Sequence, residues 1–213
     1  FAEPGFKEFA PSLSGMAAAA RQAGASGLTI WVLCASAEAA DRCKEAVPGE
    51  AAKLRADVLF ALCPGFFAQP ASRPSKAAGP LFSLFSRERP ELVLFEDGIR
   101  SRELALRLAF DAQAACMTEV RGFERGETLS LLRSSYNANL TAVLELPLPA
   151  AERPGVFTVV PGDFPPVSEA DEPAAFAPEI RRDELSCGAG AKEAESAAVL
   201  LPAKVETGLK SAK

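Results

Sequence analysis

The sequence predicts an α/β protein with three layers, in which helices cover both faces of a mostly parallel sheet. Two observations lead to this fold class. Short β-branched and aromatic runs have the character of buried strands, at 28–34, 57–62 and 92–95. Alanine-rich or amphipathic stretches separate these runs, at about 12–23, 37–46, 76–88 and 100–113. Strands that alternate with helices at this spacing are typical of right-handed βαβ units.

The individual elements follow from local composition. Gly27 precedes the first strand, Leu28-Thr29-Ile30-Trp31-Val32-Leu33-Cys34, and marks where it begins. The clearest helix is 100–113, where we expect an apolar side and a charged side. The apolar side would hold Leu104, Leu106, Leu108 and Phe110, and the charged side Arg102, Glu103, Arg107 and Asp111.

The pattern changes after residue 115. Four strand candidates follow one another with short turns and no helix between them, at 116–120, 127–134, 140–146 and 156–160. We expect them to add antiparallel strands to the parallel core, which gives an α/β domain over 1–160. Proline and acidic residues then predict an arm or linker over 161–195, because proline cannot donate to a strand ladder. A strand-like run at 197–205 indicates that 196–213 begins a further domain.

Composition narrows the range of functions. The chain has 213 residues, 48% of them hydrophobic and 24% charged, which fits one sizeable globular domain with an arm. A formal net charge of −5 argues against a general nucleic-acid binder, and no uncharged apolar run is long enough to cross a bilayer. The sequence contains no histidine, so histidine-activated nucleophiles and imidazole metal sites are excluded.

The five cysteines are scattered and form no Cys-x-x-Cys pair, so they predict neither a zinc site nor an iron–sulfur site. Thiols in or beside apolar runs act as small core residues, which favours a reducing compartment. The chain begins at Phe1 without a signal-peptide pattern, and we expect a fragment or a processed chain.

Six segments, taken in chain order, carry a family resemblance: Phe1-Ala2-Glu3, Arg102-Glu103-Leu104-Ala105, Met117-Thr118-Glu119-Val120, Arg133-Ser134-Ser135-Tyr136-Asn137-Ala138-Asn139, Phe157–Gly162 and Phe164-Pro165-Pro166. As an ordered set they resemble the N-terminal domain of the electron transfer flavoprotein alpha subunit. The first is similar to the end of that family's first strand, and the next three are similar to its helix start, next strand and turn, with Asn137 and Ala138 in place of two glycines. The last two are similar to its later strand and proline-rich arm.

The resemblance implies an adenine nucleotide alpha hydrolase-like sheet in a subunit that pairs with a beta subunit. In the complete protein, FAD would carry electrons from dehydrogenases, such as those of fatty acid β-oxidation, to a quinone oxidoreductase. Gly208-Leu209-Lys210-Ser211 resembles the opening of the flavin domain, so the cofactor-binding candidates are Thr207, Gly208, Leu209 and Lys210. Val205-Glu206-Thr207 replaces the family's Gly-Gly-Arg, and this fragment alone is not expected to hold FAD. The family's location would be the bacterial cytoplasm or the mitochondrial matrix.

The remaining candidates concern interfaces and turns. Arg102, Glu103 and Arg133 are candidates for the subunit interface, although Arg102 and Glu103 could equally form a charge pair in the first turn of a solvated helix. Arg133, Tyr136 and Asn139 fit a turn that orders the antiparallel strands. Glu96-Asp97 follows a strand where α/β sites commonly lie, but we favour Asp97 or Ser101 as the cap of the next helix.

The sequence therefore favours a scaffold domain of an electron carrier, with no catalytic residue and no metal site in this stretch. Two alternatives stay open. One is a flavin-less paralogue that acts as a structural subunit, in keeping with Val205-Glu206-Thr207. The other is a stand-alone AMP- or ATP-binding module, although we find no glycine-rich phosphate loop at the start of a helix.

Overall fold

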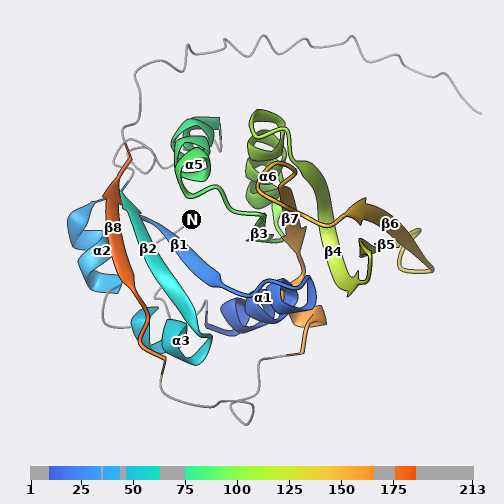
Figure 1. Ribbon diagram of the computed structural model, residues 1–213, viewed down its shortest axis with the longest axis horizontal. Helices are drawn as coiled ribbons and strands as arrows, with labels where there is room; N and C mark the ends of the chain where they lie inside the picture. Colours follow the sequence, from blue (N-terminus) through green and yellow to red (C-terminus); the bar gives the residue numbers. More distant parts are fainter. Residues whose placement is uncertain (1–9, 35, 44–46, 63–74, 166–175, 186–213) are drawn as a thin grey trace, which may run out of the picture.

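The computed structural model describes residues 10–34, 36–43, 47–62, 75–165 and 176–185, and within them it forms two sheets with helices packed around them (Figure 1). The first sheet has the strand order β1 (Leu28–Cys34), β2 (Ala56–Leu62) and β8 (Ile180–Glu184). The second has the order β3 (Leu92–Glu96), β7 (Gly155–Val159), β4 (Ala115–Arg125), β5 (Thr128–Ser135) and β6 (Leu140–Pro147). The helices are α1 (Ala10–Gln22), α2 (Ala37–Cys43), α3 (Val47–Lys53), α5 (Ser75–Glu88), α6 (Ile99–Asp111) and the short 3₁₀ helix η2 (Pro161–Asp163).

Most strand pairs are parallel, which confirms the expected mixed α/β class. In the first sheet β2 pairs in parallel with both β1 and β8. In the second sheet β7 pairs in parallel with β3 and β4, and only the pairs β4–β5 and β5–β6 are antiparallel. No helix among the described residues combines the length and apolarity needed to cross a membrane.

Alternating side chains place helices on both faces of the second sheet. Phe157 and Val159 of β7 pack with Ala19 and Ala23 on the α1 side. Val156, which precedes Phe157 and so points the other way, packs with residues of α5 and α6 on the opposite face. All five residues of β7 are buried, as expected for a strand covered on both faces.

The first sheet is covered in the same way. Val58 and Phe60 of β2 pack against α2 and α3, where Ala40 and Ala51 are fully buried. Leu59 of β2 faces the opposite side and packs with residues of α5 and with Leu185. Trp31 of β1 contacts both the cluster around Leu59 and the cluster around α6, so it links the cores of the two sheets.

The direction of β7 corrects one expectation. The run at 156–160 was expected to be an added antiparallel strand, but it lies in parallel between β3 and β4. The connection after β6 brings the chain back to the end of the sheet at which β3 and β4 begin, so β7 runs in the same direction as both strands. The runs at 127–134 and 140–146 do form the expected antiparallel strands β5 and β6.

The predicted arm also contains a strand. Within 161–195 the structure places β8, whose backbone pairs with β2 from Val58↔Ile180 to Leu62↔Glu184. Ion pairs hold this charged strand on both sides, since Arg181 Nη2 lies 2.7 Å from Glu88 of α5 and Arg182 Nη2 lies 2.6 Å from Asp41 of α2. The proposed strand at 197–205 and the segment 196–213 lie outside the described residues.

Helix α6 has a different apolar side from the one expected. Its buried residues are Leu104, Ala105, Leu108 and Ala109. Leu106 is 54% exposed and Phe110 is 84% exposed. The strict alternation of leucines in the sequence has a period of two, whereas one face of a helix repeats every three or four residues, so Leu106 and Phe110 lie opposite Leu104 and Leu108.

Candidate functional site

Five side chains with polar or charged groups meet where β3 and β7 end, beside the first turn of α6. We call this group the arginine–carboxylate cluster, and it consists of Asp97, Arg102, Glu119, Arg133 and Thr158. The backbone positions it directly. Asp97 follows β3, and its N–H donates to the carbonyl of Val159, at the end of β7, over 2.8 Å. The carboxyl ends of parallel strands are the usual place for sites in α/β proteins.

Asp97 and Arg102 form a two-point ion pair. Arg102 Nε donates to Asp97 Oδ1 over 2.9 Å, and Arg102 Nη2 donates to Asp97 Oδ2 over 2.6 Å. The Asp97 side chain is 12% exposed and that of Arg102 is 38% exposed. Parallel N–H···O bonds of this kind fix the orientation of both planar groups, so the contact locks the first turn of α6 to the end of β3.

Thr158 connects this pair to the neighbouring strand. Its side chain is fully buried, and its hydroxyl donates to Asp97 Oδ1 over 2.6 Å. The Thr158 hydroxyl oxygen also accepts a hydrogen bond from the backbone N–H of Glu119 over 2.9 Å. One buried hydroxyl therefore satisfies groups from β4 and from the segment after β3, which explains why a polar residue is tolerated in the core.

Glu119 bridges the two arginines. Its Oε1 lies 3.1 Å from Arg102 Nη2, and its Oε2 lies 3.1 Å from Arg133 Nη2. Its backbone has φ of 59°, in the left-handed region that non-glycine residues seldom adopt. This conformation coincides with the irregular register of β4 against β7 between Met117 and Val120, and it turns the Glu119 amide toward Thr158.

The electrostatic environment keeps these carboxylates paired. Burial alone would raise the pKa of Asp97, but hydrogen bonds from Arg102 and Thr158 outweigh it, so the pKa lies below its ordinary value. A hydrogen bond to Asp97 raises the pKa of Arg102. The Asp97 carboxylate is therefore held ionised beside Arg102, so this contact serves to fix structure and is ill suited to proton transfer.

The cluster brings together two of the three predicted interface residues. Arg102 and Arg133 share Glu119, whereas Glu103 lies on the exposed side of α6 and pairs with Arg107 over 3.1 Å. Arg133 Nε is buried and has no hydrogen-bond partner among the described residues. The cofactor candidates Thr207, Gly208, Leu209 and Lys210 lie outside the described residues.

The expected helix cap is wrong. The residue that precedes α6 as its N-cap is Gly98, and no side chain caps the helix there. Asp97 is one residue too early to cap, and its carboxylate is engaged by Arg102 and Thr158.

Sequence reasoning missed the roles of Glu119 and Thr158. Glu119 belongs to the motif Met117-Thr118-Glu119-Val120, but nothing in the local sequence identifies its partners. Thr158 looked like an ordinary β-branched strand residue.

The turn between β5 and β6 has the conformation that the replaced glycines would favour. The φ angles are positive at Tyr136 (49°), Asn137 (53°) and Ala138 (65°). Asn139 stabilises the turn, because its side-chain Nδ2 donates to the carbonyl of Tyr136 over 3.0 Å. Asparagine tolerates the left-handed region well, whereas tyrosine and alanine do so poorly, so Tyr136 and Ala138 carry the strain of this turn.

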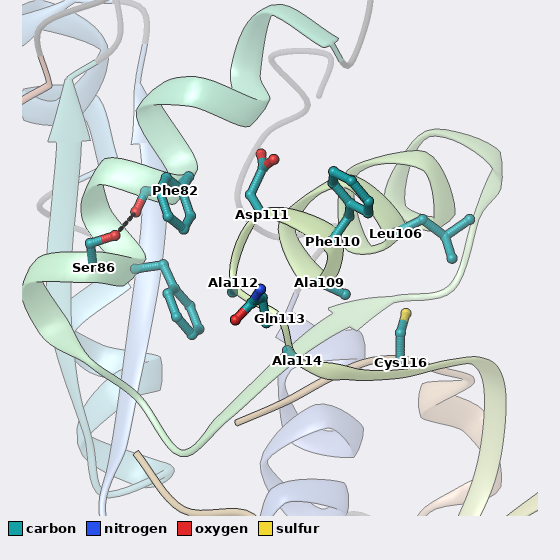
Figure 2. Close-up of a pocket in the computed structure, with 11 residues that line it drawn as sticks. Phe82, Ser86, Leu106, Ala109, Phe110, Asp111, Ala112, Gln113, Ala114 and Cys116 are labelled. Atoms are coloured by element: carbon teal, nitrogen blue, oxygen red, sulfur yellow. Dashed lines mark hydrogen bonds between the residues drawn. The ribbon is translucent and has the colours of Figure 1, made fainter. Parts of the chain in front are cut away.

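Exposed apolar side chains gather on the solvent side of α6. We call this surface the outer face of α6, defined by Ile99, Glu103, Leu106 and Phe110. Ile99 is 91% exposed and Phe110 is 84% exposed. A groove beside it lies between α5 and α6 and reaches the start of β4, as Figure 2 shows. It is lined by Phe82, Phe85, Ser86, Leu106, Ala109, Phe110, Asp111, Ala112, Gln113, Ala114 and Cys116.

A metal site outside the arginine–carboxylate cluster would be a further source of chemistry. Across the described ranges, no cluster of three or more cysteine, aspartate or glutamate side chains could hold a metal ion. Comparison with protein-family models and with curated proteins finds no match for this chain.

Proposed function

We propose that this chain is the scaffold domain of an alpha-type electron transfer flavoprotein subunit. It would dock a beta subunit, so that FAD in the complete protein carries electrons from dehydrogenases to a quinone oxidoreductase. The sheet would then be of the adenine nucleotide alpha hydrolase-like class, and the protein would work in the bacterial cytoplasm or the mitochondrial matrix. No residue of this domain would take part in electron transfer chemistry.

One observation supports the proposal most directly. Three of the motifs that carry the resemblance each contribute one residue to the arginine–carboxylate cluster. Arg102 comes from the helix-start motif, Glu119 from the strand motif and Arg133 from the turn motif, and Glu119 contacts both arginines over 3.1 Å. Motifs that depend on one another in this way behave as a single structural unit, as expected if they belong together in one family.

The outer face of α6 supplies a surface for docking. Ile99, Leu106 and Phe110 expose apolar area on one side of a helix whose other side is buried. Apolar and aromatic side chains at the centre of an interface contribute most of its binding energy. The ion pair between Glu103 and Arg107 lies on the same exposed side and suits the polar rim of such an interface.

The test is co-purification with an electron transfer flavoprotein beta subunit. We expect a 1:1 complex that Phe110→Lys weakens at least about tenfold, because the substitution places a charge at an apolar contact. Ser83→Lys, which adds the same charge on the exposed side of α5, serves as the matched control. A complex that forms equally well with Phe110→Lys would show that the docking surface lies outside the outer face of α6. Failure to form any complex would overturn the docking role.

An absorbance spectrum of the gene product purified with the beta subunit separates the remaining possibilities. Flavin bands at near-stoichiometric amounts would support an electron carrier. A colourless complex would instead identify a structural paralogue without flavin. Binding of AMP or ATP by the chain alone, without a partner, would favour a nucleotide-binding module.

A further inference from the structure

Strand β6 is an open edge of the second sheet. It is last in the strand order, and among the described residues its only strand partner is β5 (Figure 1). Its side chains are exposed on both faces, with Leu140 and Val143 each 57% exposed and Leu144 41% exposed. Among the described residues, the backbone N–H and C=O groups of β6 that face away from β5 therefore have no strand partner, and they lie beside exposed apolar side chains.

Natural proteins usually protect such an edge with charges, and the edge strands β8 and β6 differ in this respect. The edge strand β8 carries four charges in five residues: Arg181, Arg182, Asp183 and Glu184. β6 carries one, Glu145, in eight residues. Charged side chains on an edge discourage pairing with another chain. The edge at β8 is protected against a further strand, whereas the edge at β6 remains able to accept one.

The side-chain pattern of β6 is complementary to itself. The even-numbered residues are all apolar, Leu140, Ala142, Leu144 and Leu146, and Leu146 packs against the core on the α1 side of the sheet. The odd-numbered residues include Thr141, Val143 and Glu145. An antiparallel partner must keep these two sets on their own faces, because a slip of one residue would bring the apolar set to the polar side.

We propose that β6 pairs antiparallel with β6 of a second copy of this chain, about a two-fold axis at Val143. In this register Val143 faces its counterpart, Leu140 faces Leu146, and Ala142 faces Leu144. Thr141 faces Glu145, so the hydroxyl can donate to the carboxylate and no two like charges are opposed. Of the two neighbouring registers that also preserve the faces, one puts Glu145 opposite Val143 and the other puts it opposite Asn139, and a further step toward the end of the strand opposes two Glu145 carboxylates.

The pairing joins the second sheets of two copies into one continuous sheet and closes as a symmetric dimer, because both copies use the same surface. A contact built mainly on one short strand buries little area. Interfaces below about 1,200 Å² are characteristic of weak association, so we expect a dimer with a dissociation constant in the micromolar range. The surface is separate from the outer face of α6, since α6 packs on β3, β4 and β7.

Sedimentation equilibrium of the 213-residue chain alone tests the proposal, over concentrations from about 1 to about 300 µM. We expect a reversible monomer–dimer equilibrium. Val143→Lys should weaken the dimer at least about tenfold, because two ammonium groups then oppose each other across the axis. A chain that stays monomeric throughout would overturn the proposal, and so would a dimer that Val143→Lys leaves unchanged.

Thr141→Lys is the matched control and tests the register. It adds the same charge at a neighbouring exposed position of β6, but it faces Glu145 of the other copy, so the dimer should persist. Equal loss in both variants would overturn the register centred on Val143. Circular dichroism and thermal unfolding establish that each variant is folded.

Hydrogen exchange gives a readout that needs no substitution. The outward-facing β6 amides should become protected as the concentration rises through the dissociation constant. Protection that appears only when a beta subunit is added would overturn the self-pairing and assign this edge to the partner. Because Phe110→Lys affects only the docking proposal and Val143→Lys only the dimer, failure of one proposal can be told apart from failure of the other.

Discussion

Arg102, in the first turn of α6, folds back onto Asp97, the residue two positions before that helix begins. The two planar groups meet through hydrogen bonds of 2.9 and 2.6 Å, and Arg102 also contacts Glu119 of β4 over 3.1 Å. A single guanidinium thus ties the start of α6 to the segment after β3 and to β4. The stability of this region should therefore depend on the planar shape of the Arg102 guanidinium as well as on its charge.

Replacing Arg102 should lower the free energy of unfolding. Arg102→Met leaves the largely buried Asp97 carboxylate with Thr158 as its remaining side-chain donor, and we expect a loss of about 2–4 kcal/mol. Arg102→Lys keeps the charge but not the two-point contact, and should lose about half as much. Urea denaturation measures both. The control is Arg107→Met, whose pair with Glu103 is exposed and should contribute less than about 1 kcal/mol. Equal losses at Arg102 and Arg107 would contradict this account.

The stabilisation from Asp97 should disappear in acid. The pKa of Asp97 in the folded protein lies below its ordinary value of 3.8, so the folded state favours the ionised form. Its contribution is complete above about pH 5 and is lost as the pH falls through and below 3.8. We expect the parent protein to exceed Asp97→Asn in stability near pH 7 and the gap to narrow below about pH 4. Urea denaturation measures the free energy of unfolding of both proteins at each pH. A difference between them that stays constant from about pH 7 to below about pH 4 would show that Asp97 does not titrate in this way.

Two helical glycines should respond to alanine in opposite directions. A Cβ added at Gly15 in α1 would collide with the Pro161 backbone of η2, including its carbonyl carbon at 2.8 Å. Gly15→Ala should therefore cost about 1–3 kcal/mol in stability. An added Cβ at Gly49 in α3 meets nothing within 4 Å, and Gly49→Ala should stabilise by about 0.5–1 kcal/mol through helix propensity. Thermal unfolding of both variants checks the signs, and a stabilising Gly15→Ala would refute the close packing of α1 on η2.

The thiol of Cys34 should be protected from alkylation in the folded protein. Burial at the end of β1, together with the nearby Cys43, raises the pKa of this thiol to about 11, and the residue is 4% exposed. Because the thiolate is the reactive form, iodoacetamide at about pH 8 should leave Cys34 unmodified until the chain is unfolded. Peptide mass spectrometry follows the modification, with the half-buried Cys43 as an internal comparison. Reaction of Cys34 at the same rate in native and denatured protein would contradict its burial.

Local patterns predicted the positions of most elements. The apolar run at 28–34 coincides with β1, and the run at 57–62 lies within β2. Such runs depend on burial of both faces, which a short window of sequence can show. The direction of β7 could not be predicted in this way, because it depends on where the preceding connection returns the chain. β8 could not be predicted because its sequence is highly charged and lacks the apolar pattern of a strand. Its charged residues pair with partners far away in the sequence, such as Glu88 for Arg181.

The candidate site was predicted in part for a similar reason. Arg102 and Arg133 stood out through the family resemblance, but their common partner Glu119 has no local signal. Thr158 lies 39 residues after Glu119, and the hydrogen bond between them exists only once β4 and β7 are neighbours. Polar networks of this kind depend on tertiary structure. The sequence can therefore predict individual residues of the network but not the contacts between them.

The position of β7 determines when this molecule can fold during synthesis. β7 separates β3 from β4 in the sheet, yet it follows both in the chain, and its residues begin at Gly155. A nascent chain that has emerged only as far as β6 holds β3 and β4 with no strand to join them. The hairpins formed by β4, β5 and β6 can assemble early through local contacts, but the parallel part of the sheet must wait for β7. A ribosome-bound intermediate in which the position between β3 and β4 is still empty therefore follows from the order of the strands.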